Sequence, residues 1–266
     1  MSFRLSGTTA RSSLCRILGL AAAFGSLVCS ADAAQGTIAV AANFTSTAQE
    51  LAAAFERRSG HDLVIATGST GQLYAQIRQG APFDVLLAAD RERPALLFAE
   101  QQAAAEPFTY ATGQLVLWSP DPQRIPQDGA AFLAAERKGR IALANPKLAP
   151  YGLAARESLV ALGLWESYSG RIVMGQNIAQ TFQITATGGV QAGLVALSQL
   201  QDAPADLKGS HWVVPSEMHT PIRQDAVLLL RGRNNPAARA FLAFLTAPEG
   251  CAAIRAAGYM TGEACP

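Results

Sequence analysis

The chain of 266 residues is long enough for one large domain or two smaller ones. Half of its residues are hydrophobic and only 15% are charged, a composition that supplies a buried core and argues against disorder. Without the first 33 residues, the remaining 18 basic and 19 acidic residues nearly cancel. Such a near-neutral body has no electrostatic surface for nucleic acid or for an anionic membrane, so we expect neither partner.

The first 33 residues have the pattern of an export signal. Three arginines lie around the start of an apolar stretch over residues 17–28, and Ala31-Asp32-Ala33 matches a small-x-small cleavage site. An apolar run of about a dozen residues is shorter than the roughly 20 that span a bilayer. We therefore predict a cleavable signal peptide over residues 1–33 and a soluble mature protein. The alternative is an amphipathic or buried first helix.

The number and positions of the cysteines are consistent with export to an oxidising compartment. Loss of the signal peptide leaves two of the four, Cys251 and Cys265. In an oxidising compartment, these two are expected to form a disulfide that ties the tail to the last helix. A metal site is the alternative, but two thiols without a nearby histidine are a poor zinc ligand set. We therefore predict a disulfide and no metal site.

Strand and helix signals alternate along the first part of the mature chain. The predicted elements are strands at residues 37–41, 62–66 and 83–89 and helices at 45–58 and 71–79, followed by a helix that Asp90 caps. In that last helix, Leu96 and Leu97 are expected to face inward. This alternation predicts a parallel, doubly wound α/β sheet.

The pattern changes at residues 115–118, and after the Pro-rich loop that follows, a second stretch of the same kind begins. Further predicted elements are strands at 140–144, 171–174, 194–197 and 226–230 and helices at 151–162, 178–186, 236–245 and 249–257. Prolines punctuate both sides of this second unit. We therefore expect two Rossmann-like α/β lobes with a ligand cleft between them, because open α/β sheets bind ligands beyond the carboxyl ends of their strands.

Four strand-to-helix turns are rich in Asn, Ser, Thr and Gly. They are residues 42–47, 67–71, 145–152 and 175–180. The first turn of a helix has unpaired N–H groups and the positive end of the helix dipole, so such turns can bind anions. Their only cation is Lys147, so neutral donors would face the ligand. The same residue types also serve as ordinary caps and turn formers. The residues alone therefore leave both interpretations open.

A series of short motifs resembles the periplasmic molybdate-binding proteins of ABC importers. The motifs are AANFT at 41–45, GSTG at 68–71, GAPFDV at 80–85, NPKLAPYG at 145–152, GSHW at 209–212 and AAGY at 256–259. The likeness follows the family's order over residues 36–259. It implies the two-crossover periplasmic binding protein fold, with residues 34–113 and 222–266 in lobe I and residues 114–221 in lobe II.

By matched position, the resemblance also implies the anion ligands. Asn43 and Thr70 would donate from lobe I, through their side chains. The main-chain N–H groups of Tyr151 and Ile178 would donate from lobe II. The expected ligand is molybdate or tungstate, bound in the periplasm and handed to a membrane permease.

Two neighbouring positions, Ala42 and Ser69, are expected to be additional contacts. Ala42 stands where one branch of the family has a threonine, so the resemblance implies one hydroxyl fewer there. A monomer without enzymatic activity or cofactor is expected. Alternatives are the same fold binding sulfate or phosphate, or a secreted hydrolase, although the sequence shows no nucleophile elbow of the G-x-S-x-G type.

Overall fold

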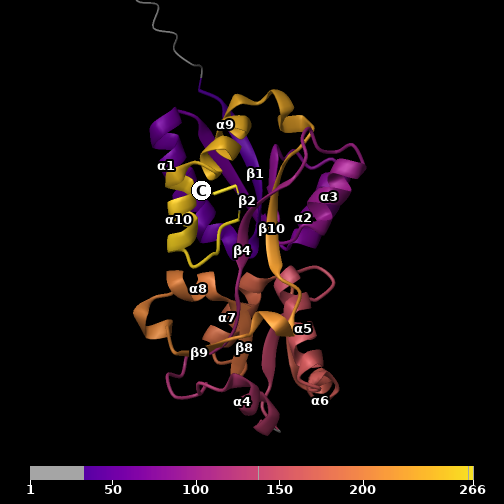
Figure 1. Cartoon of the computed structure of the whole chain (residues 1–266), viewed down its shortest axis with the longest axis vertical. Coiled ribbons are helices and arrows are strands. Elements are labelled where there is room, and N and C mark those ends of the chain that lie inside the picture. The colour runs from indigo at the N-terminus through magenta and orange to yellow at the C-terminus, as the bar shows by residue number, and fades with distance from the viewer. Residues whose placement is uncertain (1–32, 137, 263, 266) are drawn as a thin grey trace, which may run out of the picture. The chain divides into compact units, whose positions relative to one another are not determined.

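The computed structural model describes residues 33–136, 138–262 and 264–265. The expected signal peptide lies outside the described residues, apart from Ala33. The described chain forms two separate five-stranded sheets with helices packed on them (Figure 1). We keep the name lobe I for the part built on the first sheet and lobe II for the part built on the second.

The first sheet has the strand order β2-β1-β3-β10-β4. Its strands are β1 (Gln35–Ala41), β2 (Asp62–Gly68), β3 (Val85–Leu87), β4 (Phe108–Gly113) and β10 (Ile222–Leu228). β1 is parallel to β2 and β3, whereas β10 is antiparallel to β3 and β4. The three strands predicted at residues 37–41, 62–66 and 83–89 are parallel as expected, and the antiparallel strand β10 makes the complete sheet mixed. The chain leaves lobe I along β4 and returns along its neighbour β10, so these two strands run in opposite directions.

The second sheet has the order β7-β6-β8-β5-β9. Its strands are β5 (Leu115–Ser119), β6 (Ile141–Ala144), β7 (Ile172–Gly175), β8 (Ala192–Ala196) and β9 (Ser210–Val213). Here β5 runs antiparallel to its two neighbours, β8 and β9. The chain enters lobe II along β5 and leaves it after β9, so these two adjacent strands run in opposite directions. The chain therefore passes twice between the sheets, and the predicted two-lobed α/β fold is confirmed.

Helices cover both faces of the first sheet (Figure 1). One face carries α1 (Thr45–Ser59), α9 (Pro236–Leu245) and α10 (Pro248–Ala256), and the other carries α2 (Thr70–Arg78) and α3 (Glu92–Ala99). Successive side chains of a strand point to opposite faces. Ile38 and Val40 of β1 accordingly pack with α1, while Ala39 packs with α2 and α3. Both faces of β1 are therefore buried.

In α3, Leu97 is fully buried but Leu96 is 39% exposed. The prediction that both face inward is wrong for Leu96. Consecutive residues of a helix with 3.6 residues per turn point in clearly different directions, and only one of this pair can face the sheet.

Lobe II is built on five helices and several short turns. The helices are α4 (Gly129–Ala135), α5 (Pro150–Ala161), α6 (Trp165–Tyr168), α7 (Ile178–Ala186) and α8 (Leu197–Asp202). The 3₁₀ turns of the two lobes are η1 (Ala42–Phe44), η2 (Ser169–Arg171), η3 (Ala205–Leu207), η4 (Ser216–Met218) and η5 (Arg231–Asn234). Trp118 of β5 stacks on Phe182 of α7 with 4.5 Å between ring centroids, which fixes α7 on its sheet.

The long periodic segments were predicted best. The bounds of α7 and α9 agree with the prediction, whereas the strand expected at 83–89 spans only Val85–Leu87 and the one expected at 226–230 spans Ile222–Leu228. The strands β4, β5 and β9 and the helices α4, α6 and α8 were not predicted. Each has at most seven residues, too few for a clear period.

No single described helix is long and apolar enough to cross a membrane. Taken together, α9 and α10 have the length and the apolar composition of a membrane-spanning segment, but they meet at a bend of 64°. The apolar side chains Phe241, Phe244 and Leu245 of α9 are buried against the first sheet, so this pair is accounted for as part of the core of lobe I.

The C-terminal tail is fastened to lobe I at two places. Cys251 of α10 and Cys265, the two cysteines expected to pair, form a disulfide with 5.6 Å between their Cα atoms. Between them, Thr112 of β4 and Met260 exchange two main-chain hydrogen bonds of 2.7 and 3.0 Å. The tail is thus held beside the strand through which the chain leaves lobe I.

Candidate functional site

A small space, the inner cavity, lies where strands of both sheets end and their helices begin. Its volume is about 10 Å³, roughly what one water molecule needs. The residues that line it are Ala41, Ala42, Asn43, Ser69, Thr70, Ala89, Ala149, Pro150, Tyr151, Asn177 and Ile178. All six positions expected at the site are among them. The structure thus brings the four predicted turns together around a space that suits only a compact ligand.

The start of α2 presents two buried hydroxyl groups to the inner cavity. Ser69 is the N-cap residue, and its Oγ accepts a hydrogen bond of 3.3 Å from the N–H of Gln72. In return, the N–H of Ser69 donates a bond of 3.2 Å to Oε1 of Gln72. The hydroxyl of Thr70 accepts a bond of 3.0 Å from the N–H of Ala89. A hydroxyl that accepts in this way still has its own hydrogen to donate. Ser69 and Thr70 therefore keep one donor each.

The main-chain N–H groups at the helix starts are also free. Thr70, Tyr151 and Ile178 occupy the first two positions of α2, α5 and α7, and the hydrogen bonds among described residues include none from their N–H groups. Such N–H groups lack an intrahelical acceptor, and they lie at the positive end of the helix dipole. Three helix N-termini from two lobes therefore converge on one cavity, an arrangement that suits an anion.

Asn43 was expected to donate through its side chain. Both hydrogens of its amide are already engaged, because Nδ2 donates to Oε1 of Gln224 at 2.9 Å and to the hydroxyl of Tyr259 at 3.1 Å. The described hydrogen bonds include none from its main-chain N–H. The part of Asn43 that remains for a ligand is therefore the main-chain N–H in η1, while the side chain fixes the residue in place.

The inner cavity carries no formal charge. Tyr151 is the one titratable residue among the described residues that line it, and burial raises the pKa of its hydroxyl well above the usual value. Burial likewise raises the pKa of the neighbouring hydroxyl groups of Tyr110 and Tyr259. Lys147, the only cation in the four turns, is exposed and does not line the cavity. Neutral dipoles alone would hold an anion here.

Direct contacts between the lobes enclose the cavity. The N–H of Gly71 in lobe I donates to the carbonyl oxygen of Leu148 in lobe II at 2.9 Å. Arg93 of α3 donates from Nη2 to the carbonyl oxygen of Lys147 at 3.1 Å and forms an ion pair with Asp90. The lobes are therefore closed on each other, with the turn at 145–149 held against α2 and α3.

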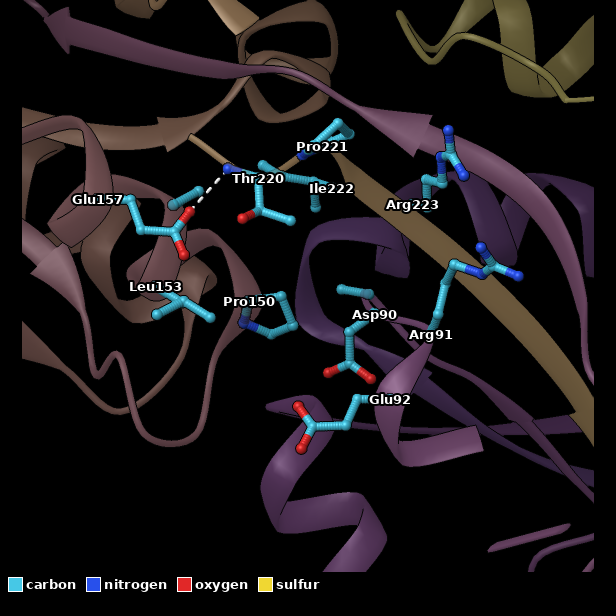
Figure 2. A pocket seen from close by; sticks show the side chains of 12 residues that line it. Asp90, Arg91, Glu92, Pro150, Leu153, Glu157, Thr220, Pro221, Ile222 and Arg223 are labelled. Carbon is cyan, nitrogen blue, oxygen red and sulfur yellow. Dashed lines mark hydrogen bonds between the residues drawn. The ribbon is translucent and has the colours of Figure 1, made fainter. Parts of the chain in front are cut away.

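A larger space, the outer cleft, adjoins the inner cavity and shares Ala89 and Pro150 with it. Its volume is about 470 Å³. Figure 2 shows that residues 90–92 of lobe I line one side and residues 150–157 of lobe II the other, with the segment 220–223 between them. On the lobe II side, Glu157 accepts a bond of 2.7 Å from the N–H of Thr220.

The outer cleft is lined by charges of both signs, and two of them, Asp90 and Arg91, form ion pairs. Burial raises the pKa of Asp90, opposed by the guanidinium of Arg93 beside it. Arg91 pairs with Asp225 at 3.4 Å, and in Figure 2 its side chain points away from Asp90. The cleft therefore has no single-sign lining that would select a charged ligand, and the converging donors belong to the inner cavity.

The two carboxylates that flank β3, Asp84 before it and Asp90 after it, are structural. Asp84 accepts from the N–H of Thr37 at 2.8 Å and pairs with Arg231 at 2.7 Å, while Asp90 is paired with Arg93. Neither faces a nucleophile. Within residues 33–136, 138–262 and 264–265, no group of three or more His, Cys, Asp or Glu side chains could hold a metal ion.

Two lobes closed on a small space lined by neutral donors define a two-lobed solute-binding protein. The family model described as bacterial extracellular solute-binding protein matches residues 37–260. The molybdate-binding protein ModA of Azotobacter vinelandii is 45% identical over 236 residues, 88% of this chain and 93% of that protein. ModA of Rhodobacter capsulatus is 46% identical over 224 residues, 84% of this chain and 87% of that protein.

Comparison with solved structures leads to the same family. The periplasmic molybdate-binding protein of Azotobacter vinelandii superposes with a TM-score of 0.80 at 38% identity, covering 86% of this chain and 100% of that one. The chain therefore belongs to the bacterial extracellular solute-binding proteins, in the group formed by the molybdate-binding proteins. This membership confirms the family that the sequence motifs indicated. It also confirms the prediction that the chain is a binding protein and not an enzyme. The sulfate-binding protein SubI of Mycobacterium tuberculosis, with a TM-score of 0.69 at 11% identity, shares the fold alone.

Three residues behind the inner cavity were not singled out in the sequence. They are Ser198, Gln224 and Tyr259, whose side chains contact Asn43. Only Tyr259 carried a signal, as the last residue of the AAGY motif. The other two lie 155 and 181 residues from Asn43 along the chain, a separation at which no local pattern indicates contact.

Proposed function

We propose that this chain binds molybdate in the inner cavity and delivers it to the membrane permease of an ABC importer. The observation that carries the proposal is the convergence of three helix N-termini and two hydroxyl donors on one small uncharged space. The relatives at 45% and 46% identity are molybdate-binding proteins, which favours molybdate over sulfate or phosphate. Tungstate, which is nearly the same size as molybdate, would bind as well. The mature protein would act in the periplasm as a monomer, after loss of residues 1–33.

Each lobe would supply part of the donor set. From lobe I, the hydroxyl and N–H of Thr70 and the N–H of Asn43 would donate, with the hydroxyl of Ser69 as an additional contact. From lobe II, the N–H groups of Tyr151 and Ile178 would donate. Ala42 lines the cavity without a hydroxyl, so that position would contribute no side-chain donor.

The ligand would act by favouring the closed form. We propose that residues 34–113 and 222–266 move against residues 114–221, with hinges near residues 113 and 221. A ligand shifts such an equilibrium only by the difference between its affinities for the two forms. An anion bonded to both lobes satisfies this condition because an open form would lose the donors of one lobe.

Titration calorimetry on the mature chain from Ala34 onward tests the function. Binding of one molybdate per chain, undisplaced by an excess of sulfate or phosphate, is the expected result. Equal competition by sulfate would replace molybdate with a less selective oxyanion function. No heat and no thermal stabilisation with molybdate would refute the proposal.

Replacing Thr70 by valine should weaken molybdate binding by about ten- to hundredfold, since a hydrogen bond to a charged group is worth about 1.5–3 kcal/mol. Valine keeps the shape of threonine and removes only the hydroxyl. Thr185→Val is a matched control, because the buried hydroxyl of Thr185 bonds to the carbonyl oxygen of Thr181 inside α7. Calorimetry on both variants should show a change for Thr70 alone. A wild-type affinity in Thr70→Val would remove this hydroxyl from the donor set.

Molybdate affinity should be nearly constant between about pH 7 and pH 9, because a tyrosine hydroxyl ordinarily titrates near 10 and burial raises the pKa of Tyr151 further. No other described residue that lines the inner cavity titrates. Calorimetry at several pH values, corrected for buffer ionisation, measures this. A tenfold or larger change in affinity across this range would show that a titratable group outside the lining controls the site.

A further inference from the structure

A buried group of six polar side chains, the closure network, lies directly behind the inner cavity. Its members are Asn43, Tyr110, Tyr151, Ser198, Gln224 and Tyr259, each at most 5% exposed. Four of them come from lobe I, whereas Tyr151 and Ser198 come from lobe II. Hydrogen bonds connect all six. The network therefore crosses from one lobe to the other at the back of the site.

Tyr259 holds Asn43 from two sides. Its hydroxyl donates to the carbonyl oxygen of Asn43 at 2.7 Å and accepts from Nδ2 of the same residue at 3.1 Å. Its ring packs edge-on against Phe44, with 5.2 Å between centroids. The disulfide and the pairing of Met260 with Thr112 fix the tail on both sides of it. Tyr259 thus sets the orientation of Asn43, which lines the inner cavity.

Ser198 extends this contact to lobe II. It lies in the first turn of α8, and its Oγ is 3.2 Å from the carbonyl oxygen of Asn43 and 2.9 Å from the hydroxyl of Tyr259. A second, longer link joins Nε2 of Gln224 to the hydroxyl of Tyr151 at 3.4 Å. These links join residues of different lobes, so separation of the lobes would break them.

We propose that Ser198 and Tyr259 are positioning residues for anion binding, which lock the closed form by joining lobe II to Asn43 without touching the anion. The inference rests on the proposed function. Hydrogen bonds made only in the closed form stabilise that form. Their loss should therefore speed the release of molybdate and leave its association rate almost unchanged.

The test compares Ser198→Ala, Tyr259→Phe and the double variant with the wild type. Stopped-flow fluorescence gives the molybdate association and dissociation rates, and calorimetry gives Kd. Each single variant should raise Kd by about three- to tenfold through faster dissociation, because each removes the buried hydrogen bond between Ser198 and Tyr259 that joins the lobes. The double variant should raise Kd by less than the product of the two single effects, because both remove the same bond.

Tyr168→Phe is the matched control. The hydroxyl of Tyr168 is buried and donates to the carbonyl oxygen of Leu133 at 2.9 Å, within lobe II. This variant should lose thermal stability to a similar degree and keep the wild-type Kd and dissociation rate. A purely structural role for Ser198 and Tyr259 would give the same behaviour in all variants.

The outcomes separate the inference from the function on which it rests. If wild-type protein does not bind molybdate, both are overturned. If it binds molybdate and Ser198→Ala keeps Kd and dissociation rate within about twofold, well below the effect of one hydrogen bond, the inference alone is overturned. Ser198→Ala removes a single oxygen atom, so it gives this answer even if Tyr259→Phe folds poorly.

Discussion

Gly152→Ala is expected to raise the Kd for molybdate by about a hundredfold, the upper range for loss of a hydrogen bond to a charged group. Gly152 lies in the first turn of α5, directly after Tyr151. A Cβ atom there would lie 2.2 Å from the carbonyl oxygen and 2.6 Å from the carbonyl carbon of Ala144. Those atoms end β6 and cannot rotate away as a side chain would. The first turn of α5 must therefore move, and the N–H of Tyr151 moves with it.

The same substitution should also lower the free energy of unfolding by about 1–3 kcal/mol, the usual cost of overpacking. Gly170→Ala is the control, because a Cβ at Gly170 would meet nothing within 4 Å. Calorimetry with molybdate and urea unfolding without it measure the two effects separately. A folded Gly152→Ala protein with wild-type Kd would show that the start of α5 does not contact the anion.

Substitutions at Gly71 should change stability and affinity in opposite directions. A Cβ at this position would lie 3.0 Å from the carbonyl oxygen and 3.1 Å from the Cα of Leu148. These atoms belong to lobe II, whereas Gly71 belongs to lobe I. A side chain here therefore acts as a wedge between the lobes. In the open form it should be harmless or favourable, because alanine is better than glycine inside a helix by about 0.5–1 kcal/mol.

For Gly71→Ala we expect a loss of about tenfold in molybdate affinity, comparable to losing the bond of 2.9 Å between Gly71 and Leu148. Gly71→Val should lose more, because its side chain is larger. Thermal unfolding without molybdate should show no loss for the alanine variant. X-ray scattering with saturating molybdate should show a larger radius of gyration for the valine variant than for wild type.

Gly36→Ala controls for tight packing as such. A Cβ at Gly36 would lie 3.1 Å from a side-chain atom of Leu63, a similarly close contact that stays within lobe I. This variant should keep its molybdate affinity. If Gly71→Ala and Gly36→Ala both bind as tightly as the wild type, the contact between Gly71 and Leu148 does not contribute to closure.

Local patterns were sufficient for much of the fold, and together with the family resemblance they indicated the residues that line the inner cavity. The helices α7 and α9 each show a helical period with start and stop signals within about a dozen positions. The sequence alone therefore predicted their bounds. The six expected site positions follow strand ends and begin helices, and a helix start leaves N–H groups free wherever it occurs. Their convergence follows from the rule that strand ends of open α/β sheets meet at one edge.

The tertiary structure decided what local patterns do not contain. The reversed directions of β5 and β10 come from the two passages between the lobes, and the period of a strand is the same in either direction. The amide of Asn43 bonds to Gln224 and Tyr259, which lie 181 and 216 residues away. Both of its hydrogens are therefore committed by contacts that form only when the chain has folded. The sequence by itself indicated which turns line the inner cavity, whereas packing decided which hydrogen-bond donors of those turns remain free.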